Sequence, residues 1–368
     1  MNPHATLIET QSIFLVILGL NGVLMYLLPR LTRPDLYFAI TVPADFRDSV
    51  EGADILRRYR LEVLIHSLIA LALVLLSLGV RFTEVLSVAG LFWQVIGCFV
   101  AYLRARPRVK PHAVAPATLR EADLEPRPAR LPGGWALQVG PFAILAAVAV
   151  WLQLHWAQIP DRFPVHWGLD GKPNGWATRS IAGVYNPLLV GAAVCAGVGL
   201  LAYGITSWAR RIQVRGGPGR SEKRFRRTML SLLVATQYLM ALLFAWVGFL
   251  ALRTQEQMPS PVAVIVPVLV FTVLMVVVLI RTGQGGSRLP EYASGSPVPP
   301  AAPAGDRTPD RYWIAGIFYV NRNDPAIIVE KRFGIGYTLN FGQPVSWIVI
   351  GLLVLVPLAI ALIARSHH

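Results

Sequence analysis

Eight apolar stretches, each long enough to cross a bilayer, alternate with polar segments along the chain. They cover residues 9–29, 62–80, 83–103, 136–156, 182–208, 228–252, 262–280 and 343–364. An α-helix needs about 20 apolar residues to cross the hydrocarbon core of a bilayer, which is about 30 Å thick. The pattern therefore predicts an all-α, polytopic membrane protein with about eight transmembrane helices.

Lys and Arg concentrate in alternate connecting segments. The segments after the first, third, fifth and seventh stretches hold 6, 7, 8 and 7 of them, which is 28 of the 34 in the chain. Basic residues are retained in cytoplasmic loops during membrane insertion. We therefore expect a multi-pass protein of the cell inner (cytoplasmic) membrane, with these four segments inside and with the N-terminus and the C-terminus extracytoplasmic.

Composition and charge indicate which partners and cofactors the chain is expected to have. Hydrophobic residues make up 54% of the chain, and the net charge is +14. The basic residues lie where anionic lipid headgroups attract them, so we expect the lipid bilayer as a partner and no nucleic acid. The two cysteines, Cys98 and Cys195, both fall inside apolar stretches, which excludes a disulfide framework. No cofactor motif is present, and no cofactor is expected.

The connecting segments predict six regions. They are an N-terminal three-helix membrane region with cytoplasmic loops (1–135), a helix pair (136–208) carrying an extracytoplasmic loop (157–181), a basic cytoplasmic loop with a helix pair (209–283), a disordered linker (284–310), a small cytoplasmic β-rich module (311–342) and a C-terminal transmembrane helix (343–368). Residues 104–134, rich in Arg, Pro and Ala, predict a second linker that is unstructured or lies along the membrane surface. Short apolar pieces separated by turn residues predict a β-meander directly before the last helix.

The fifth apolar stretch carries small residues at every fourth position. These residues are Gly191, Cys195 and Gly199. Lipid provides no hydrophobic drive for helix association, so small residues allow the close contacts that hold membrane helices together. We expect neighbouring helices to approach this face closely.

The predicted extracytoplasmic loop is rich in residues that constrain the backbone. Proline fixes φ and glycine permits turns closed to other residues, so we expect a loop that holds one shape without helix or sheet. Loops built in this way commonly carry function. The candidate ligand residues in it are Asp161, Pro164, His166, Trp167, Asp170, Gly171, Asn174 and Trp176.

Three interpretations of this loop are open. His166, Asp161 and Asp170 could bind a divalent cation, because imidazole and carboxylate suit zinc or manganese, although their spacing lacks the helical regularity of a zinc motif. His166 and Asp170 could instead hydrogen-bond the backbone of a turn. Trp167, Trp176 and Phe163 could lie at the membrane surface, as anchors or beside polar groups that recognise a peptide or a lipid headgroup.

Four short motifs of the loop form a recognisable pattern: Ile159-Pro160, Phe163-Pro164, His166-Trp167 and Gly171-Lys172-Pro173-Asn174. The pattern resembles the extracytoplasmic loop of the SdpI-type bacterial membrane proteins, which are named for immunity against a secreted killing peptide. The resemblance implies protection of the membrane from that peptide and recruitment of a transcriptional repressor when the peptide is sensed. The implied partners are a secreted peptide outside and a cytoplasmic regulator protein inside.

The β-rich region resembles a second, uncharacterised module found in longer members of the same family. The residues that suggest it include Trp313, Tyr319, Asn321, Asp324, Lys331, Arg332 and Asn340. These residues are the candidate functional positions of the cytoplasmic side.

The favoured hypothesis is a non-enzymatic integral membrane protein that acts in immunity, sensing or signal transduction through its extracytoplasmic loop. One alternative is a metal-dependent membrane enzyme that acts on an envelope substrate through His166, Asp161 and Asp170. Another is a transporter or permease component, which the near absence of charge in the apolar stretches disfavours. The sequence leaves the ligand and the oligomeric state open.

Overall fold

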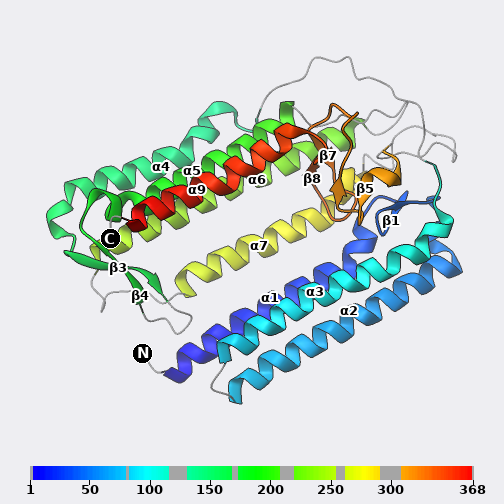
Figure 1. Ribbon diagram of the computed structural model, residues 1–368, viewed down its shortest axis with the longest axis horizontal. Helices are drawn as coiled ribbons and strands as arrows, with labels where there is room; N and C mark the ends of the chain where they lie inside the picture. Colours follow the sequence, from blue (N-terminus) through cyan, green and yellow to red (C-terminus); the bar gives the residue numbers. More distant parts are fainter. Residues whose placement is uncertain are drawn as a thin grey trace. The chain divides into compact units, whose positions relative to one another are not determined.

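Long apolar helices dominate the computed structural model of the chain, which describes residues 3–79, 83–115, 131–167, 173–207, 219–253, 262–290 and 308–366 (Figure 1). Within these residues, 7 helices are long and apolar enough to cross a membrane. They are α1 (Pro3–Leu31), α2 (Val50–Leu76), α3 (Thr83–Val109), α4 (Gly134–Leu154), α5 (Ile181–Ser207), α6 (Gly219–Phe249) and α7 (Val262–Thr282). A further helix with a shorter apolar stretch, α9 (Pro344–Ser366), follows. The predicted all-α polytopic membrane fold is confirmed.

The chain divides into two compact units, each assembled from three segments. The first unit comprises Met1–Glu125, Ala209–Arg226 and Thr272–Gln343. The second comprises Pro126–Trp208, Arg227–Phe271 and Pro344–His368. The peptide bond between Gln343 and Pro344 is therefore one of the places where the chain passes from one unit to the other.

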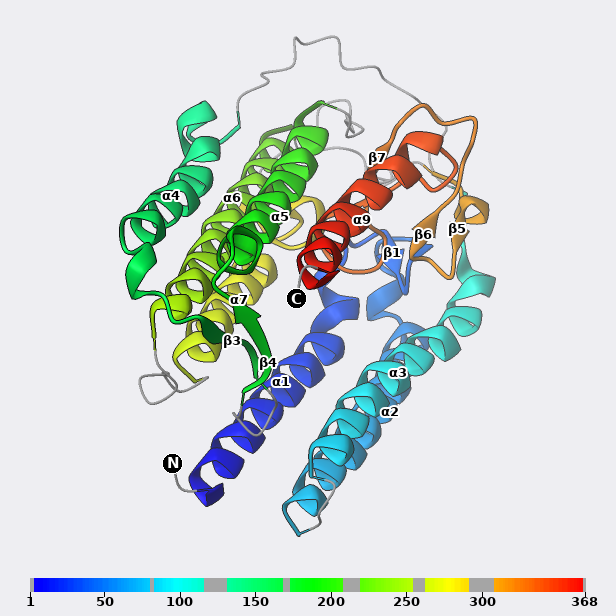
Figure 2. The ribbon, with the colours of Figure 1, turned by 60° about the vertical axis from the view of Figure 1, so that its left-hand side comes forward.

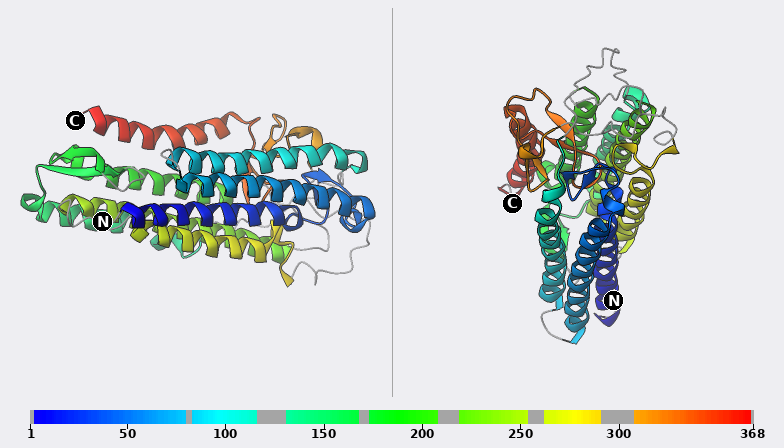
Figure 3. Two further views of the ribbon diagram at one scale, coloured as in Figure 1. Left: turned by 90° about the horizontal axis from the view of Figure 1, so that it is seen from below. Right: turned by 90° about the vertical axis from the view of Figure 1, so that its right-hand side faces the viewer.

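In the first unit, α1, α2 and α3 lie side by side (Figure 3, blue to cyan). Gln94 of α3 joins them through its side-chain amide. Its Oε1 accepts a hydrogen bond from Asn21 Nδ2 (2.9 Å), and its Nε2 donates to Ser67 Oγ and to the Leu18 carbonyl (both 3.0 Å). Such interhelical hydrogen bonds and close packing hold helices together in lipid.

The segment between α1 and α2 is folded. It forms a hairpin of β1 (Leu36–Tyr37) and β2 (Ile40–Thr41), followed by a short 3-10 turn, η1 (Phe46–Asp48). The Arg47 guanidinium donates to the Thr32 hydroxyl (2.7 Å) and to the carbonyls of Arg33 and Leu36. Arg47 therefore fixes the conformation of the segment that directly follows the C-terminus of α1.

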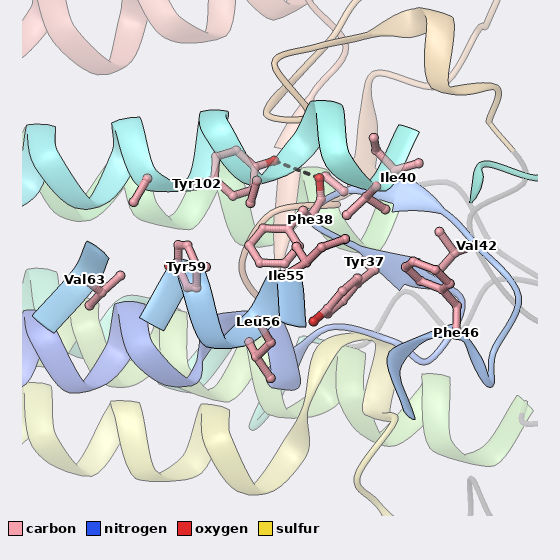
Figure 4. Packing of buried hydrophobic residues seen from close by; sticks show 14 of the residues in the cluster. Tyr37, Phe38, Ile40, Val42, Phe46, Ile55, Leu56, Tyr59, Val63 and Tyr102 are labelled. Carbon is pink, nitrogen blue, oxygen red and sulfur yellow. Dashed lines mark hydrogen bonds between the residues drawn. The ribbon is translucent and has the colours of Figure 1, made fainter. Parts of the chain in front are cut away.

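An aromatic core fixes this hairpin to the helices (Figure 4). The ring of Phe38 contacts those of Tyr37, Tyr59 and Tyr102, with centroid distances of 4.8, 5.0 and 6.2 Å. Tyr59 belongs to α2 and Tyr102 to α3, so the hairpin closes over the ends of both helices. Aromatic pairs in edge-to-face geometry add to the stability gained from burial.

In the second unit, α5 packs against both α4 and α9 (Figure 2). A Cβ atom placed on Gly191 would lie 2.6 Å from Phe244, and one on Gly197 would lie 2.6 Å from Leu353 of α9. Gln237 of α6 donates to the Cys195 carbonyl (2.9 Å), and the Cys195 thiol donates to the Gln237 carbonyl (3.4 Å). The predicted close approach along the small residues of α5 is confirmed.

Both predicted linkers are partly folded, which corrects the sequence-based expectation. Helix α3 runs on through Arg104 and Arg106 to Val109, because Ala105 and Val109 are buried and Arg106 bonds to the Phe38 carbonyl (2.8 Å). At the other linker, a short 3-10 turn, η7 (Gln284–Gly286), and Thr308 are packed into the first unit. Residues 116–130 and 291–307 lie outside the part of the chain that the structure describes.

The β-rich segment before α9 is present, but its strands do not form a continuous meander. After a 3-10 turn, η8 (Asp310–Tyr312), β5 (Trp313–Ile314) pairs with β6 (Phe318–Tyr319), and β7 (Ile328–Glu330) pairs with β8 (Tyr337–Leu339). One parallel bridge, between Tyr319 and Asn340, joins the two hairpins. Side-chain hydrogen bonds from the turn at Asn321–Asp324 replace the pairing between β6 and β7 that a meander would need. We call residues 308–343 the C-terminal module.

Candidate functional site

The segment between α4 and α5 forms an antiparallel hairpin of β3 (Arg162–Trp167) and β4 (Pro173–Thr178). The expectation of a loop without sheet was therefore wrong. Pro164 pairs with Trp176 and His166 with Gly175, with register shifts on both sides of His166. Proline has no backbone N–H to donate to a neighbouring strand. It is tolerated in edge strands and at bulges, and this hairpin offers both, because each strand has an unpaired edge in the described part of the chain and the register shifts at His166. Prolines are therefore compatible with this hairpin.

The base of the β3–β4 hairpin is anchored on the second unit. Ile159, Phe163 and Ala177 are buried in the same core as residues of α4, α5 and α6. Arg179 donates to Asp161 (2.5 Å) and to the Ile159 carbonyl (3.1 Å). The Arg162 guanidinium lies over the ring of Trp176, 5.1 Å from its centroid. These contacts fix how the hairpin leaves the helices.

The candidate ligand residues of this hairpin have different surroundings. Pro164 is buried, Trp176 is half-buried, and the Asp161 side chain is 88% exposed although it pairs with Arg179. Asp170 and Gly171 lie outside the described residues, as do the side chains of His166, Trp167 and Asn174. The described part of the chain contains no group of three His, Cys, Asp or Glu residues that could hold a metal ion. Metal binding by His166, Asp161 and Asp170 stays a hypothesis.

Asn340 is the centre of the C-terminal module and is fully buried. Its Oδ1 accepts from the backbone N–H groups of Asn321 and Gly342, both at 3.0 Å. Its Nδ2 donates to the carbonyls of Asn321, Asp324 and Ala326 at 2.8–3.1 Å. One amide side chain thus satisfies five backbone groups of a turn-rich segment that lacks regular pairing, as buried backbone groups require.

The turn between β6 and β7 is held by its own side chains. Tyr319 donates to Asp324 Oδ2 (2.7 Å), and Asn321 Nδ2 donates to the Tyr319 hydroxyl (3.1 Å). Asp324 Oδ1 accepts from the Ala326 N–H at 3.1 Å. Asp and Asn side chains stabilise turns through such local bonds. The predicted site residues Tyr319, Asn321 and Asp324 therefore form one buried network.

Arg332 joins the module to the hairpin between α1 and α2. Its side chain is 0% exposed, and its guanidinium lies 5.3 Å from the ring centroid of Trp313. It donates to Asp310 Oδ1, to the Thr308 carbonyl and to the Ala39 carbonyl (3.4 Å). Asp310 also accepts from the Thr41 hydroxyl (2.9 Å). A buried cation needs this number of partners to offset its loss of hydration.

A second ionic contact lies between the same two segments. Arg33 pairs with Glu330 of β7 (2.9 Å) and lies 3.6 Å from Asp35. The Gln284 side chain accepts from the Arg33 N–H (3.2 Å) and donates to the Lys331 carbonyl. Burial lowers the pKa of the half-buried Lys331 ammonium. Charged groups thus hold the module on the end of α1.

Two tight turns meet at the same place, and both have unusual backbone geometry. Phe38 and Ala39 have φ of 45° and 58°, and Ala315 has φ of 52°. Non-glycine residues at such angles cost about 1–2 kcal/mol each. The Tyr102 hydroxyl bonds to the carbonyls of Ala315 (3.1 Å) and Phe38 (3.4 Å), linking the turns. A strained backbone conformation of this kind persists where the surrounding contacts hold the turn in it.

Gly316→Ala is expected to destabilise the contact between the two turns by about 2–3 kcal/mol. The glycine has φ of 74°, and an added Cβ would lie 2.6 Å from both Ala39 Cβ and the Tyr102 hydroxyl. Gly334→Ala is the matched control, because Gly334 has φ of 85° but no atom within 4 Å of the added Cβ. The control is expected to cost about 1 kcal/mol, the conformational part alone. Equal losses of thermal stability would contradict the close packing of the turns.

Alkaline pH is expected to weaken the fold around Tyr37. Burial raises the pKa of its hydroxyl to about 12, although Arg47 opposes the rise, and the hydroxyl donates to the Gly52 carbonyl (2.9 Å). The unfolded chain releases this proton near pH 10, so stability is lost between about pH 10 and about pH 12, by roughly 2–3 kcal/mol. The stability difference between wild type and Tyr37→Phe should therefore shrink from pH 9 to pH 11. An unchanged difference would refute the assignment.

Sequence reasoning predicted the central residues of the C-terminal module but not all of their partners. Trp313, Arg332 and Asn340 are buried within it, and Lys331 is half-buried, so these residues build the module. The residues that sequence analysis missed are Arg33, Asp35, Thr41, Gln284, Thr308 and Asp310. No periodicity marks them; the weak signal is that Arg33, Asp35 and Asp310 are polar residues beside Pro34 or Pro309.

Fold and sites together define a multi-pass helical membrane protein with a β-hairpin between α4 and α5 and a folded module before α9. Residues 142–191, which include that hairpin, match a domain of unknown function, DUF1648. Residues 322–347 match a family of unknown function, DUF5808. These matches fit an uncharacterised membrane protein family, and neither description names the SdpI-type proteins. Comparison with curated proteins and with solved structures gave no match.

Proposed function

We propose that this chain is a non-enzymatic sensor or immunity protein of the bacterial inner membrane, whose β3–β4 hairpin binds an extracytoplasmic peptide. The observation that carries the proposal is the hairpin itself, which is anchored on the helices at its base and falls within the DUF1648 match. The resemblance of its sequence to the loop of SdpI-type immunity proteins supports a secreted peptide as the ligand.

The hairpin suits peptide binding for a structural reason. Its two strands pair only with each other among the described strands, so each has an outer edge with free backbone donors and acceptors. An extended peptide binds such an edge by adding a strand, with affinity from main-chain hydrogen bonds and specificity from neighbouring side chains. Arg162 and Trp176 lie where they can supply that specificity.

The sidedness of the proposal rests on the distribution of Lys and Arg. The basic segments, including the one that holds the C-terminal module, are assigned to the cytoplasm, and the β3–β4 hairpin and both termini to the outside. The C-terminal module would then face a cytoplasmic regulator protein. Its dense hydrogen bonding suits a surface that must keep one shape for a partner.

The hairpin and the module are linked by the chain itself and by one helix–helix contact. Strand β4 leads into α5, Gly197 of α5 contacts Leu353 of α9, and α9 follows directly after Gln343 of the module. A shift of α5 on peptide binding would move α9 because close-packed helices have no free volume to absorb it. Replacing Gly197 by valine should therefore uncouple the module from the hairpin while the hairpin still binds peptide.

Survival of a deletion strain in peptide-containing spent medium tests the function. Wild-type protein is expected to restore survival, whereas a variant with residues 165–175 replaced by a Gly-Ser linker should not, at equal amounts in the membrane. Thr178→Ala, at an exposed position of the hairpin base, is the control and should restore survival. The proposal fails if deletion changes neither survival nor the expression of a neighbouring regulator gene.

Cysteine labelling tests the sidedness separately. Arg162→Cys should react with an impermeant maleimide in intact cells, and Arg322→Cys only after permeabilisation, since both side chains are exposed. The native Cys98 and Cys195 are buried and should remain unlabelled. The opposite pattern would invert the assignment of every loop.

A further inference from the structure

The β5–β6 hairpin of the C-terminal module has two unlike faces. Trp313 and Tyr319 pair across the strands and are buried, with 4% and 0% exposure. Ile314 and Phe318 pair on the other face and are 60% and 47% exposed. Water solvates this exposed cross-strand pair of large apolar side chains unfavourably, so contact with lipid or protein would stabilise it.

The β5–β6 hairpin contacts α3, a helix long and apolar enough to span a membrane, near its C-terminal end. Its turn, Ala315–Gly316, lies against Tyr102 and Arg106, and Tyr102 donates to the Ala315 carbonyl. Phe333 of the same module lies 4.1 Å from the Tyr102 ring, and Leu103 beside it is exposed. Tyr102 belongs to the apolar part of α3, next to Arg104 and Arg106. Aromatic residues followed by arginines are typical of the membrane–water interface.

Chain length gives a second, independent constraint on the same face. Phe341 contacts Phe318, with ring centroids 5.4 Å apart. Helix α9 begins three residues later, at Pro344. An extended chain covers at most about 3.5 Å per residue, so Phe341 lies within about 11 Å of the first residue of an apolar helix. The end of the module is therefore held close to the point where α9 begins.

We infer that the outer face of the β5–β6 hairpin, formed by Ile314 and Phe318 with Phe341 beside it, lies in the interfacial layer of the bilayer. The hydrated headgroup region accepts the open edges of a short hairpin, which the hydrocarbon core would not. The buried face, with Trp313 and Tyr319, packs on Arg332, which contacts the first loop, while the outer face contacts lipid. The module is thus held on one side by protein and on the other by the membrane surface.

Spin labelling tests this placement. A nitroxide at Phe318→Cys, in the full chain with Cys98→Ala and Cys195→Ala, is measured in phosphatidylcholine–phosphatidylglycerol vesicles by power saturation with oxygen and with a water-soluble nickel chelate. Oxygen partitions into lipid and the chelate into water. We expect the ratio of oxygen to chelate collisions at position 318 to exceed that at Asn323→Cys, an exposed position of the same module, at least several-fold.

Two results would overturn the inference. A ratio at 318 equal to that at 323 would place the face in water. Exclusion of both reagents at 318 would mean that protein, a second copy or another partner, covers it. If the Phe318→Cys variant does not fold, a nitroxide at Ile314→Cys, on the paired strand, measures the same ratio of oxygen to chelate collisions.

Discussion

Asn340→Ala is expected to unfold the C-terminal module locally while α1, α2 and α3 stay intact. The truncation removes the side-chain amide of Asn340. The N–H groups of Asn321 and Gly342 and the carbonyl of Ala326 then lose their hydrogen bonds to it. Each buried group left without a hydrogen bond costs about 1–3 kcal/mol, so we expect a loss of about 3–5 kcal/mol. Hydrogen exchange of residues 308–343 in detergent or nanodiscs should rise accordingly.

Asn323→Ala is the matched control for this prediction. Asn323 lies in the same turn, but its side chain is exposed and only its backbone N–H bonds to Asn321 (3.0 Å). Surface substitutions of this kind usually change stability by less than about 0.5 kcal/mol. Equal exchange in both variants would show that the amide of Asn340 does not hold the module together.

Arg332→Met is expected to release the module from the hairpin between α1 and α2. Methionine fills a similar volume but cannot donate to Asp310, to the Thr308 carbonyl or to the Ala39 carbonyl. Removing one member of a buried ion pair costs about 3–5 kcal/mol. The partial exposure of Asp310 (32%) lets water take over some of the loss, so we expect the lower end of this range.

Alkylation of a cysteine at Val42 measures this release directly. Val42 is 2% exposed and follows Thr41, which bonds to Asp310. In the Val42→Cys background, Arg332→Met should raise the alkylation rate about 100-fold, since about 3 kcal/mol corresponds to two factors of ten. Arg322→Met, at an exposed arginine of the same module, should leave the rate unchanged. Similar rates in both variants would contradict the role of Arg332.

Asn340 and Arg332 stabilise different parts of the C-terminal module. Asn340 holds the turn-rich part of the module together, whereas Arg332 joins its first residues, Thr308 and Asp310, to the first loop. Under the proposed function, Arg332→Met would free the first residues of the module, Thr308 and Asp310, and with them the contact to the first loop. Signalling to a cytoplasmic regulator should then fail while peptide binding outside continues.

Local sequence was sufficient where one short-range physical rule decided the outcome. The membrane helices follow from apolar runs of about 20 residues, since only a helix satisfies its own backbone groups in lipid. The close packing at Gly191, Cys195 and Gly199 follows from side-chain size. The turn at Asn321–Asp324 follows from the local hydrogen bonds that Asn and Asp prefer.

Predictions failed where distant parts of the chain compete with local preference. The prolines of residues 159–180 suggested a loop without sheet, but pairing of two edge strands formed the β3–β4 hairpin despite them. Arg104 and Arg106 were assigned to a linker, yet the Phe38 carbonyl and the burial of Ala105 and Val109 extend α3 through them. Composition describes the average tendency of a segment and carries no information about such partners.

The sequence by itself determined that this protein crosses a membrane several times and, through its apolar runs, where the helices lie. The tertiary structure alone decided that Arg332 contacts Asp310 and Ala39, and that Arg33 contacts Glu330, which are 297 residues apart. Hydrophobic length and side-chain size act within one helix, so a local pattern records them. A buried ion pair forms between residues that only folding brings together, and neither residue bears a local mark of the other.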